Sequence, residues 1–299
     1  MSTPATTTNS YGGNSMVAPL RRVMVCPPRR AGWYVPDRAA KLRDLGYQQA
    51  PDAAAAQSEY DALRRELEDA GADVLTLPES HYFSLDAVYC HDPSFVTHSG
   101  AVILRMGKAE RATEPQRHAE FYKSQGIPIL GEITEPGTVE AGDLVWLDST
   151  TLLAGRSYRT NADGIAQLRS MLSFVDIDVI STPLPHAAGP GICLHLMSIL
   201  SMVNEHTVLV DLPMLAVETV ELLNERHFVM IEIDPYERGT QACNVLALGN
   251  RRLLALEENP RTNAWLQHAG FEVRTFPGSA IALNGGGGPT CLTRSILRA

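Results

Sequence analysis

The sequence predicts one large α/β domain built from a repeated structural unit, and three observations support this. The chain has 299 residues, 44% of them hydrophobic, which is enough to bury a sizeable core. Predicted strands and helices recur in the order strand, strand, helix, strand. No linker rich in Pro, Ser and Gly follows residue 20. Four or five such modules in a single domain over residues 21–299 therefore fit the pattern better than a doubly wound sheet.

The first twenty residues differ in composition from the rest of the chain. Residues 1–19 are rich in Ser, Thr, Asn and Gly, and the first cationic residue is Arg21. This segment lacks the charged start of a secretory or transit peptide. We expect residues 1–20 to form a flexible tail.

The domain opens with a strand over residues 22–26, which two prolines end because proline cannot donate to a ladder. A helix follows over residues 52–71, where Gly71 suits the position after the helix. The apolar positions of this helix recur at spacings of three and four and are Tyr60, Leu63, Leu67 and Ala70.

The remaining elements repeat the same order along the chain. Strands are expected at residues 73–77, 87–89, 101–106, 143–147, 151–154, 178–181, 208–210, 229–233, 244–248, 252–256 and 272–276. Helices are expected at residues 114–126, 161–172, 217–225 and 259–269.

The net charge and the distribution of apolar residues limit the kinds of molecule that the protein is expected to bind. The 34 acidic and 25 basic residues give a net charge of -9, which repels nucleic acid and anionic lipid and favours small cations. The longest nearly apolar stretch, residues 187–203, is interrupted by Gly189-Pro190-Gly191 and His195 and is too short to cross a bilayer. The five cysteines are scattered without a CxxC or zinc-finger spacing, which fits a reduced cytoplasm.

Cys291 is the first candidate for chemistry, because it follows four consecutive glycines, residues 285–288. Such a run costs conformational entropy and is tolerated mainly where the backbone approaches something closely, usually a ligand, or takes a positive φ. A loose C-terminal loop with an incidental cysteine remains an alternative. A phosphate-binding loop is disfavoured, since no Gly-Lys-Ser/Thr ending and no helix of useful length follow.

A thiol becomes a strong nucleophile when a nearby imidazolium or a bound cation stabilises the thiolate. His195 stands alone in the apolar run 192–197, which makes it the candidate partner, although a core histidine satisfied by backbone would also fit. Carboxylate pairs could hold a planar guanidinium. Glu140 with Asp143, and Asp86 with Asp92, are the candidate pairs, the alternative being solvated acids at strand ends.

Together these segments resemble the guanidino-group-modifying enzymes of the pentein (α/β propeller) superfamily, the dimethylarginine dimethylaminohydrolases most of all. The resemblance runs from about residue 21 to the C-terminus. The motifs that carry it appear in the family's order and are residues 91–95 (HDPSF), 140–143 (EAGD), 159–161 (RTN), the His195 strand and the Gly-rich loop with Cys291. The resemblance implies a five-bladed propeller of ββαβ modules with pseudo-fivefold symmetry.

The resemblance also implies a role for each candidate. Cys291 would be the nucleophile, His195 the acid and base, and Glu140 the carboxylate that orients His195. Asp92 would hold another guanidinium edge, with Asp143 beside Glu140 as a further substrate contact. Three positions would grip the amino and carboxylate ends of an arginine-like substrate: Asp86, Arg159 in its Arg-Thr-Asn motif, and Arg111, placed by its spacing from Asp92.

Two positions depart from related patterns. Arginine deiminases and amidinotransferases carry an Asp two residues after the catalytic His, where this chain has Met197. We expect Met197 to leave an apolar wall suited to an N-substituted guanidinium, which favours the methylarginine hydrolases. His91 stands where those hydrolases usually have an acid.

The resemblance implies hydrolysis of an N-methylated arginine or related guanidino compound through a Cys291 thiouronium intermediate, giving a citrulline-type product and an amine. No metal or organic cofactor is expected, and a homodimer is compatible with the family. The alternatives are an amidinotransferase or arginine deiminase, or a non-catalytic binding protein like the superfamily's ribosome anti-association factor.

Overall fold

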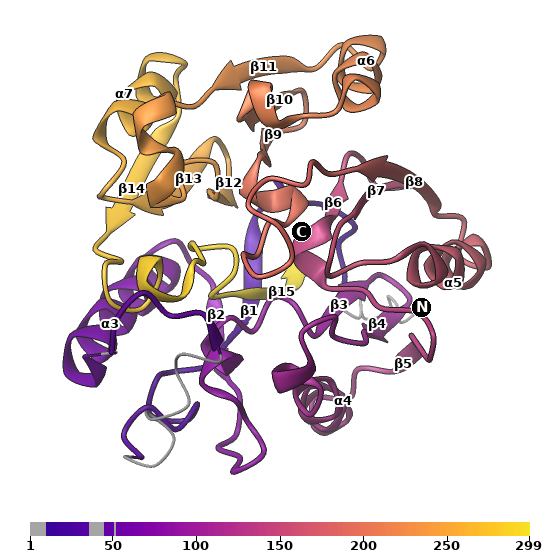
Figure 1. Cartoon of the computed structure of the whole chain (residues 1–299), viewed down its shortest axis with the longest axis vertical. Helices are drawn as coiled ribbons and strands as arrows, with labels where there is room; N and C mark the ends of the chain where they lie inside the picture. Colours follow the sequence, from indigo (N-terminus) through magenta and orange to yellow (C-terminus); the bar gives the residue numbers. More distant parts are fainter. Residues whose placement is uncertain (1–9, 36–44, 51) are drawn as a thin grey trace, which may run out of the picture.

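The structure is a computed structural model that describes residues 10–35, 45–50 and 52–299. Five three-stranded sheets are arranged around a common centre, as Figure 1 shows. The predicted five-bladed α/β propeller is therefore confirmed. None of the helices in the described part of the chain is long and apolar enough to cross a membrane.

Four of the blades are continuous in sequence. In each, two antiparallel strands precede a helix, and a third strand then pairs parallel to the second. The elements are β3 (Ser94–Thr97), β4 (Gly100–Ile103), α4 (Glu114–Ser124) and β5 (Ile129–Glu132); β6 (Leu144–Trp146), β7 (Thr151–Arg156), α5 (Ala162–Ser173) and β8 (Asp178–Pro183); β9 (Leu200–Asn204), β10 (Thr207–Val210), α6 (Val217–Glu225) and β11 (Val229–Glu232); β12 (Leu246–Gly249), β13 (Arg252–Leu256), α7 (Pro260–His268) and β14 (Glu272–Phe276).

The two ends of the chain together build the fifth blade. The C-terminal strand β15 (Arg294–Arg298) pairs antiparallel with β1 (Leu20–Val25), and β2 (Asp73–Thr76) pairs parallel with β1. The helix α3 (Ala53–Asp69) connects β1 to β2. The last residues of the chain thus close the ring of blades.

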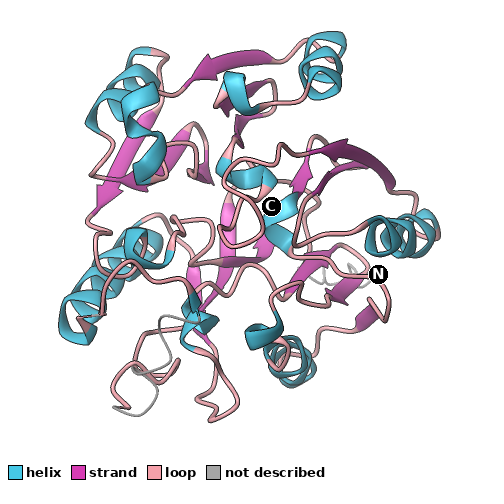
Figure 2. Cartoon of the chain, in the orientation of Figure 1, coloured by secondary structure: helices cyan, strands magenta, loops and turns pink. Residues whose placement is uncertain are grey.

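The α-helices α3 to α7 lie at the periphery of the ring, as Figure 2 shows. Local sequence signals account for α3: the Asp52 side chain accepts hydrogen bonds from Ala54 and Ala55 at its start, and Gly71 takes a φ of +90° after its end. Tyr60, Leu63 and Leu67 are buried, as their spacing predicts.

The prediction of a flexible N-terminal tail is wrong for residues 10–20. The Gly12 backbone exchanges hydrogen bonds with Ile296 and Arg298 at 2.8 and 2.9 Å, and the Asn14 amide contacts His98 Nδ1 at 2.8 Å. The Gly12 bonds hold the segment against β15, so it is part of the blade that the two ends of the chain build, and Asn14 joins it to the neighbouring blade. Residues 1–9 lie outside the described part of the chain.

Two local expectations also differ from the structure. Residues 87–89 do not form a strand, because Ser84 caps a 3₁₀ turn, η1 (Leu85–Val88), by accepting from the Asp86 N–H. His195 does not lie in a strand either. It precedes the 3₁₀ turn η4 (Leu196–Ser198), and β9 begins only at Leu200.

Candidate active site

Seven of the eight predicted site residues border a single cavity of about 40 Å³ formed by loops from several blades. Its lining residues are Asp86, Tyr89, Asp92, Lys108, Arg111, Glu140, Arg159, Cys193, His195, Gly285, Gly286, Gly287 and Cys291. The thiol, imidazole and carboxylate expected to act together therefore share one cavity, although they come from distant parts of the sequence. Of the eight predicted residues, Asp143 alone is absent from the lining.

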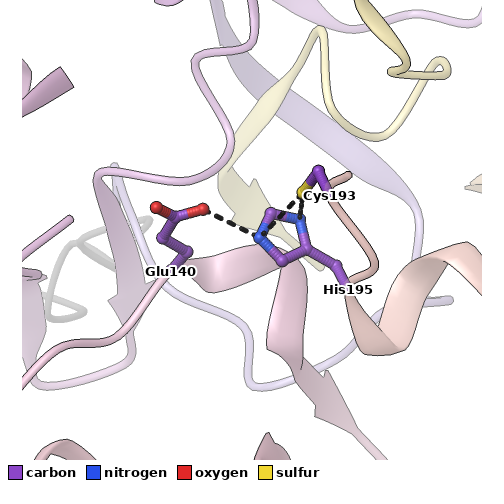
Figure 3. Close-up of side chains that lie close together, drawn as sticks. All are labelled: Glu140, Cys193 and His195. Atoms are coloured by element: carbon purple, nitrogen blue, oxygen red, sulfur yellow. Dashed lines mark hydrogen bonds and ion pairs between the residues drawn. The ribbon is translucent and has the colours of Figure 1, made fainter. Parts of the chain in front are cut away.

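The central contact joins His195 and Glu140, whose Nε2 and Oε2 atoms lie 2.8 Å apart (Figure 3). Glu140 directly precedes the turn η3 (Ala141–Asp143) and is 1% exposed. Burial alone would raise the pKa of Glu140, but the hydrogen bond and charge of His195, with the charge of Arg159, hold it below its usual range. The carboxylate is therefore ionised.

The His195 ring is held by packing from the same motif. A Cβ on Gly142 would lie 2.2 Å from His195 Nδ1, so only glycine leaves room for the ring. Burial lowers the pKa of His195, but contact with Cys193 and the charges of Asp92 and Asp143 outweigh it and raise the pKa well above its usual value. The ring is protonated at neutral pH.

The structure corrects the expectation for Asp143, which does not face the cavity. Its Oδ1 accepts a hydrogen bond from the Leu196 N–H at 2.9 Å, and its Oδ2 accepts one from Ser157 Oγ at 2.6 Å. Asp143 is fully buried. It fixes the backbone directly after His195 instead of touching substrate.

Cys291 is half-buried at the end of the glycine loop, and Asn244 Nδ2 donates a hydrogen bond to its Sγ at 3.1 Å. Burial and the Asp92 charge raise the pKa of Cys291 to about 11, although the Gly288 N–H, His195 and Asn244 each oppose the rise. The sulfur is thus a neutral thiol at neutral pH until another cation arrives.

Protein side chains account for most glycines of the loop. Gly285, Gly286 and Gly287 also border the cavity, so the close approach of this loop to a ligand stays a prediction. A Cβ on Gly285 or Gly287 would come within 2.2 or 2.5 Å of the Tyr89 ring. Gly288 packs as closely on Asn244, and Gly286 takes a φ of +79°. The loop therefore needs glycine in order to lie flat on Tyr89 and present Cys291.

His91 helps to fix the position of Cys291 and stands outside the cavity. Its backbone N–H donates to the Cys291 carbonyl at 3.1 Å, and its Nδ1 bonds the Thr293 carbonyl at 2.9 Å. Burial lowers the pKa of His91 to about 3, so the ring is neutral and Nδ1 donates. His91 thus clamps the segment that carries Cys291.

Asp92 and Arg111 form a buried network at one wall of the cavity. Arg111 Nη1 donates to Asp92 Oδ2 at 2.6 Å, and Nη2 donates to the Tyr89 carbonyl and to Glu114 at 2.8 Å. Arg111 is 4% exposed. The expected role of Arg111 in gripping a substrate carboxylate is corrected, because its guanidinium is already occupied.

Asp86 and Arg159 lie on the cavity as expected, together with Lys108, which the sequence argument missed. Lys108 Nζ contacts Asp86 Oδ2 at 2.5 Å and donates to the Leu45 carbonyl at 2.6 Å. Arg159 lies 3.6 Å from Glu140 Oε1. The signal that could have identified Lys108 is its position as a single lysine shortly after a buried strand.

Met197 does not form the expected apolar wall. It is 2% exposed and packs with Met16 and Val145 around a separate void of about 10 Å³. The backbone after His195 turns into η4, which carries residue 197 away from the cavity into the core between blades. Apart from Tyr89 and the glycine loop, the residues that border the cavity carry charged, imidazole or thiol side chains.

Cys193 is the second thiol at the cavity, and its Sγ lies 3.6 Å from each nitrogen of the His195 ring. In the described part of the chain, Glu140, Cys193 and His195 form the group whose ligand atoms lie close enough, within 4.8 Å, to hold a metal ion (Figure 3). The absence of a metal in the reaction stays a prediction. Tyr89, Asn244 and Cys193 carried no local signal that would have marked them.

Two larger cavities adjoin the site. One of about 430 Å³ is bordered by residues 156–159 and by residues between Pro183 and Leu194. The other, of about 370 Å³, is bordered by Leu45, Lys108, Tyr158, Arg159 and Pro190. Neither includes Cys291 or His195. Lys108 and Arg159 border both the inner cavity and the 370 Å³ cavity, so they mark the outer end of the site.

Comparison with known proteins places the chain among guanidine-processing enzymes. Residues 40–298 match a family model described as N,N dimethylarginine dimethylhydrolase, eukaryotic. The N(G),N(G)-dimethylarginine dimethylaminohydrolase of Pseudomonas aeruginosa is 29% identical over 75% of this chain and 82% of its own.

Two solved structures show the same similarity. A Cys-to-Ser mutant of the P. aeruginosa enzyme complexed with citrulline superimposes with a TM-score of 0.75 and 25% identity, covering 92% of this chain and 99% of that one. The N-terminal domain of ArgZ, a cyanobacterial arginine dihydrolase, gives a TM-score of 0.76 at 20% identity, with 93% and 97% coverage. The ArgZ likeness bears on the fold alone.

Proposed function

Because the chain belongs to the N,N dimethylarginine dimethylhydrolase family, we propose that Cys291 attacks the guanidinium of a small substrate, with His195 as acid and base and Glu140 orienting His195. The chain is an amidinohydrolase that cleaves guanidino C–N bonds. The observation that carries the assignment of residues is the convergence of this thiol, imidazole and carboxylate on one cavity.

The substrate itself would activate the nucleophile. The thiol of Cys291 has a pKa of about 11, so it is protonated before substrate binds. A guanidinium cation seated beside Asp92 and Glu140 adds a positive charge next to the sulfur and lowers the pKa of the thiol, whose proton leaves to solvent. The enzyme thus holds a thiolate only when a substrate is there to react.

In the first step the Cys291 thiolate forms a C–S bond to the guanidinium carbon. Protonated His195 gives its proton to the departing nitrogen as the C–N bond breaks, which releases the amine and leaves an S-alkylthiouronium on Cys291. Glu140, hydrogen-bonded to His195 Nε2, keeps the ring charged and oriented for this transfer.

In the second step water attacks the thiouronium carbon while His195 takes its proton. The tetrahedral adduct then collapses with cleavage of the C–S bond, which returns the Cys291 thiolate and releases a ureido product of the citrulline type. One histidine serves both steps, because each turnover returns its proton.

The substrate is a small cationic guanidino compound of the same chemical class as an N-methylated arginine. The inner cavity is well below the roughly 300–1,000 Å³ of common ligand sites, so the site must widen when such a substrate binds. All five cysteines are free thiols, which supports our proposal of a reduced, cytoplasmic setting.

A matched pair of variants tests the proposal. Cys291→Ser should bind substrate but lose turnover, while Cys193→Ser, which removes the other thiol of the cavity, should keep turning over. Ureido product and amine are measured with N-methylarginine. Retained turnover in Cys291→Ser would refute the assignment. Transfer of the amidino group to added glycine without ureido product would favour an amidinotransferase.

A further inference from the structure

The ammonium of Lys108 occupies the part of the site that was expected to hold the α-amino group of a substrate. Asp86 was assigned to that end, but its Oδ2 already contacts Lys108 Nζ at 2.5 Å, and the same Nζ donates to the Leu45 carbonyl at 2.6 Å. The side chains of Lys108 and Asp86 are 14% and 5% exposed, so this pair is largely shielded from water. The protein therefore supplies its own ammonium here.

Lys108 is held in place by its backbone as well. Its N–H donates to Glu140 Oε1 at 2.9 Å, which ties the start of the side chain to the carboxylate that orients His195. The preceding residue must be glycine, since a Cβ on Gly107 would lie 2.5 Å from the Arg159 carbonyl. Lys108 thus comes from a closely packed segment whose position is fixed relative to the catalytic groups.

A second cation lies beside this pair. Within the described residues, the guanidinium of Arg159 forms one long ion pair, to Glu140 at 3.6 Å, and its side chain is 12% exposed. Lys108 and Arg159 also border the outer 370 Å³ cavity, which the exposed Glu110 borders as well. The end of the site beside Asp86 therefore carries two cations next to a carboxylate that is already paired. Such an end attracts a carboxylate and repels an ammonium.

We propose that the enzyme selects ω-guanidino carboxylates without an α-amino group, with Lys108 as the residue that determines this specificity. The inference rests on the proposed function, because it orients the substrate with its guanidinium at Cys291. The carboxylate then contacts Arg159 and Lys108. A substrate with an α-ammonium would place this positive charge next to Lys108 Nζ. Asp86, the carboxylate that would otherwise bind the α-ammonium, is already paired with Lys108.

Matched pairs of compounds test the proposal. L-Arginine is compared with 5-guanidinopentanoate, and Nω-methylarginine with its counterpart lacking the amino group, using kcat/KM for ureido product. The wild-type enzyme should prefer the compounds without the amino group by about tenfold or more. Lys108→Met should move the preference toward the amino acids by a similar factor, because it frees Asp86. Lys123→Met removes the same charge from an exposed position on α4 and should leave the ratio unchanged.

Calorimetry with the Cys291→Ser variant compares the binding affinities of the same pairs of compounds without turnover. A ratio near one, a preference for the amino acids, no shift in Lys108→Met, or no binding of either member of a pair would overturn the proposal. The two failures can be told apart. Ureido product formed with the opposite preference leaves the proposed function standing, whereas guanidino acids that bind with the expected ratio but never react would count against the chemistry alone.

Discussion

The Nε2 atom of His195 and the Oε2 atom of Glu140 lie 2.8 Å apart, and the two side chains are 7% and 1% exposed. A buried imidazole at this distance from a carboxylate is stabilised in its charged form. Several consequences of this pair and of its surroundings can be measured.

Replacing Glu140 by Gln should lower activity about 100-fold or more and change its pH dependence. The protonated ring is the form that donates to the departing amine, so activity is lost as pH rises through the raised pKa of His195. Without the carboxylate that pKa falls, and the alkaline limb of kcat/KM should move to lower pH. Glu132→Gln, which removes an exposed carboxylate, serves as the control. An unchanged profile in Glu140→Gln would contradict the assigned role.

Gly142→Ala should lower kcat about 100-fold, because a misplacement of about 1 Å in a reacting group can cost that much. The added methyl would overlap His195 Nδ1. Gly239→Ala adds the same methyl where no atom lies within 4 Å and should be fully active. Both variants should show normal circular dichroism. Full activity in Gly142→Ala would mean that the ring is not held by this packing.

Asn244→Asp should raise the pKa of the Cys291 thiol above its value of about 11, because the donor to sulfur is lost and a negative charge is added. The measurement is the pH dependence of alkylation of Cys291 by iodoacetamide in a Cys193→Ser background. Asn224→Asp on the exposed face of α6 is the control. Faster alkylation in Asn244→Asp than in the parent would contradict the assigned contact.

Arg111→Met should reduce the free energy of unfolding by about 3–5 kcal/mol, since it leaves the buried carboxylates of Asp92 and Glu114 without their partner. Arg64→Met removes an exposed pair with Glu68 and should cost less than about 1 kcal/mol. Urea unfolding measures both. If Arg111→Met were as stable as the wild type and only raised KM, the earlier role in substrate binding would be restored.

Much of the fold could be predicted because its modules carry local signals. Helix α6 and strand β14 begin and end at the predicted residues, where apolar periodicity and turn residues coincide. The misses came from contacts that are distant in sequence. Nothing local indicates that residues 294–298 pair with β1, and the turn at residues 85–88 depends on a Ser84 cap instead of on the strand-forming residues that follow.

The candidate site likewise combines residues that the sequence motifs predict with contacts that they do not predict. The motif order predicted Cys291, His195, Glu140, Asp92, Asp86 and Arg159, and all six lie on one cavity. The resemblance could not show that Arg111 is already paired, that Met197 turns inward, or that Lys108 reaches Asp86. Each depends on side-chain contacts made across blades or turns.

The central claim is that the sulfur of Cys291 bonds to the guanidinium carbon during turnover. Mass spectrometry of protein quenched while it processes a guanidino substrate tests it most directly. The account predicts a thiouronium adduct on the peptide that contains Cys291, and none on the peptide that contains Cys193. An adduct on Cys193, or sustained turnover with no adduct on Cys291, would contradict it.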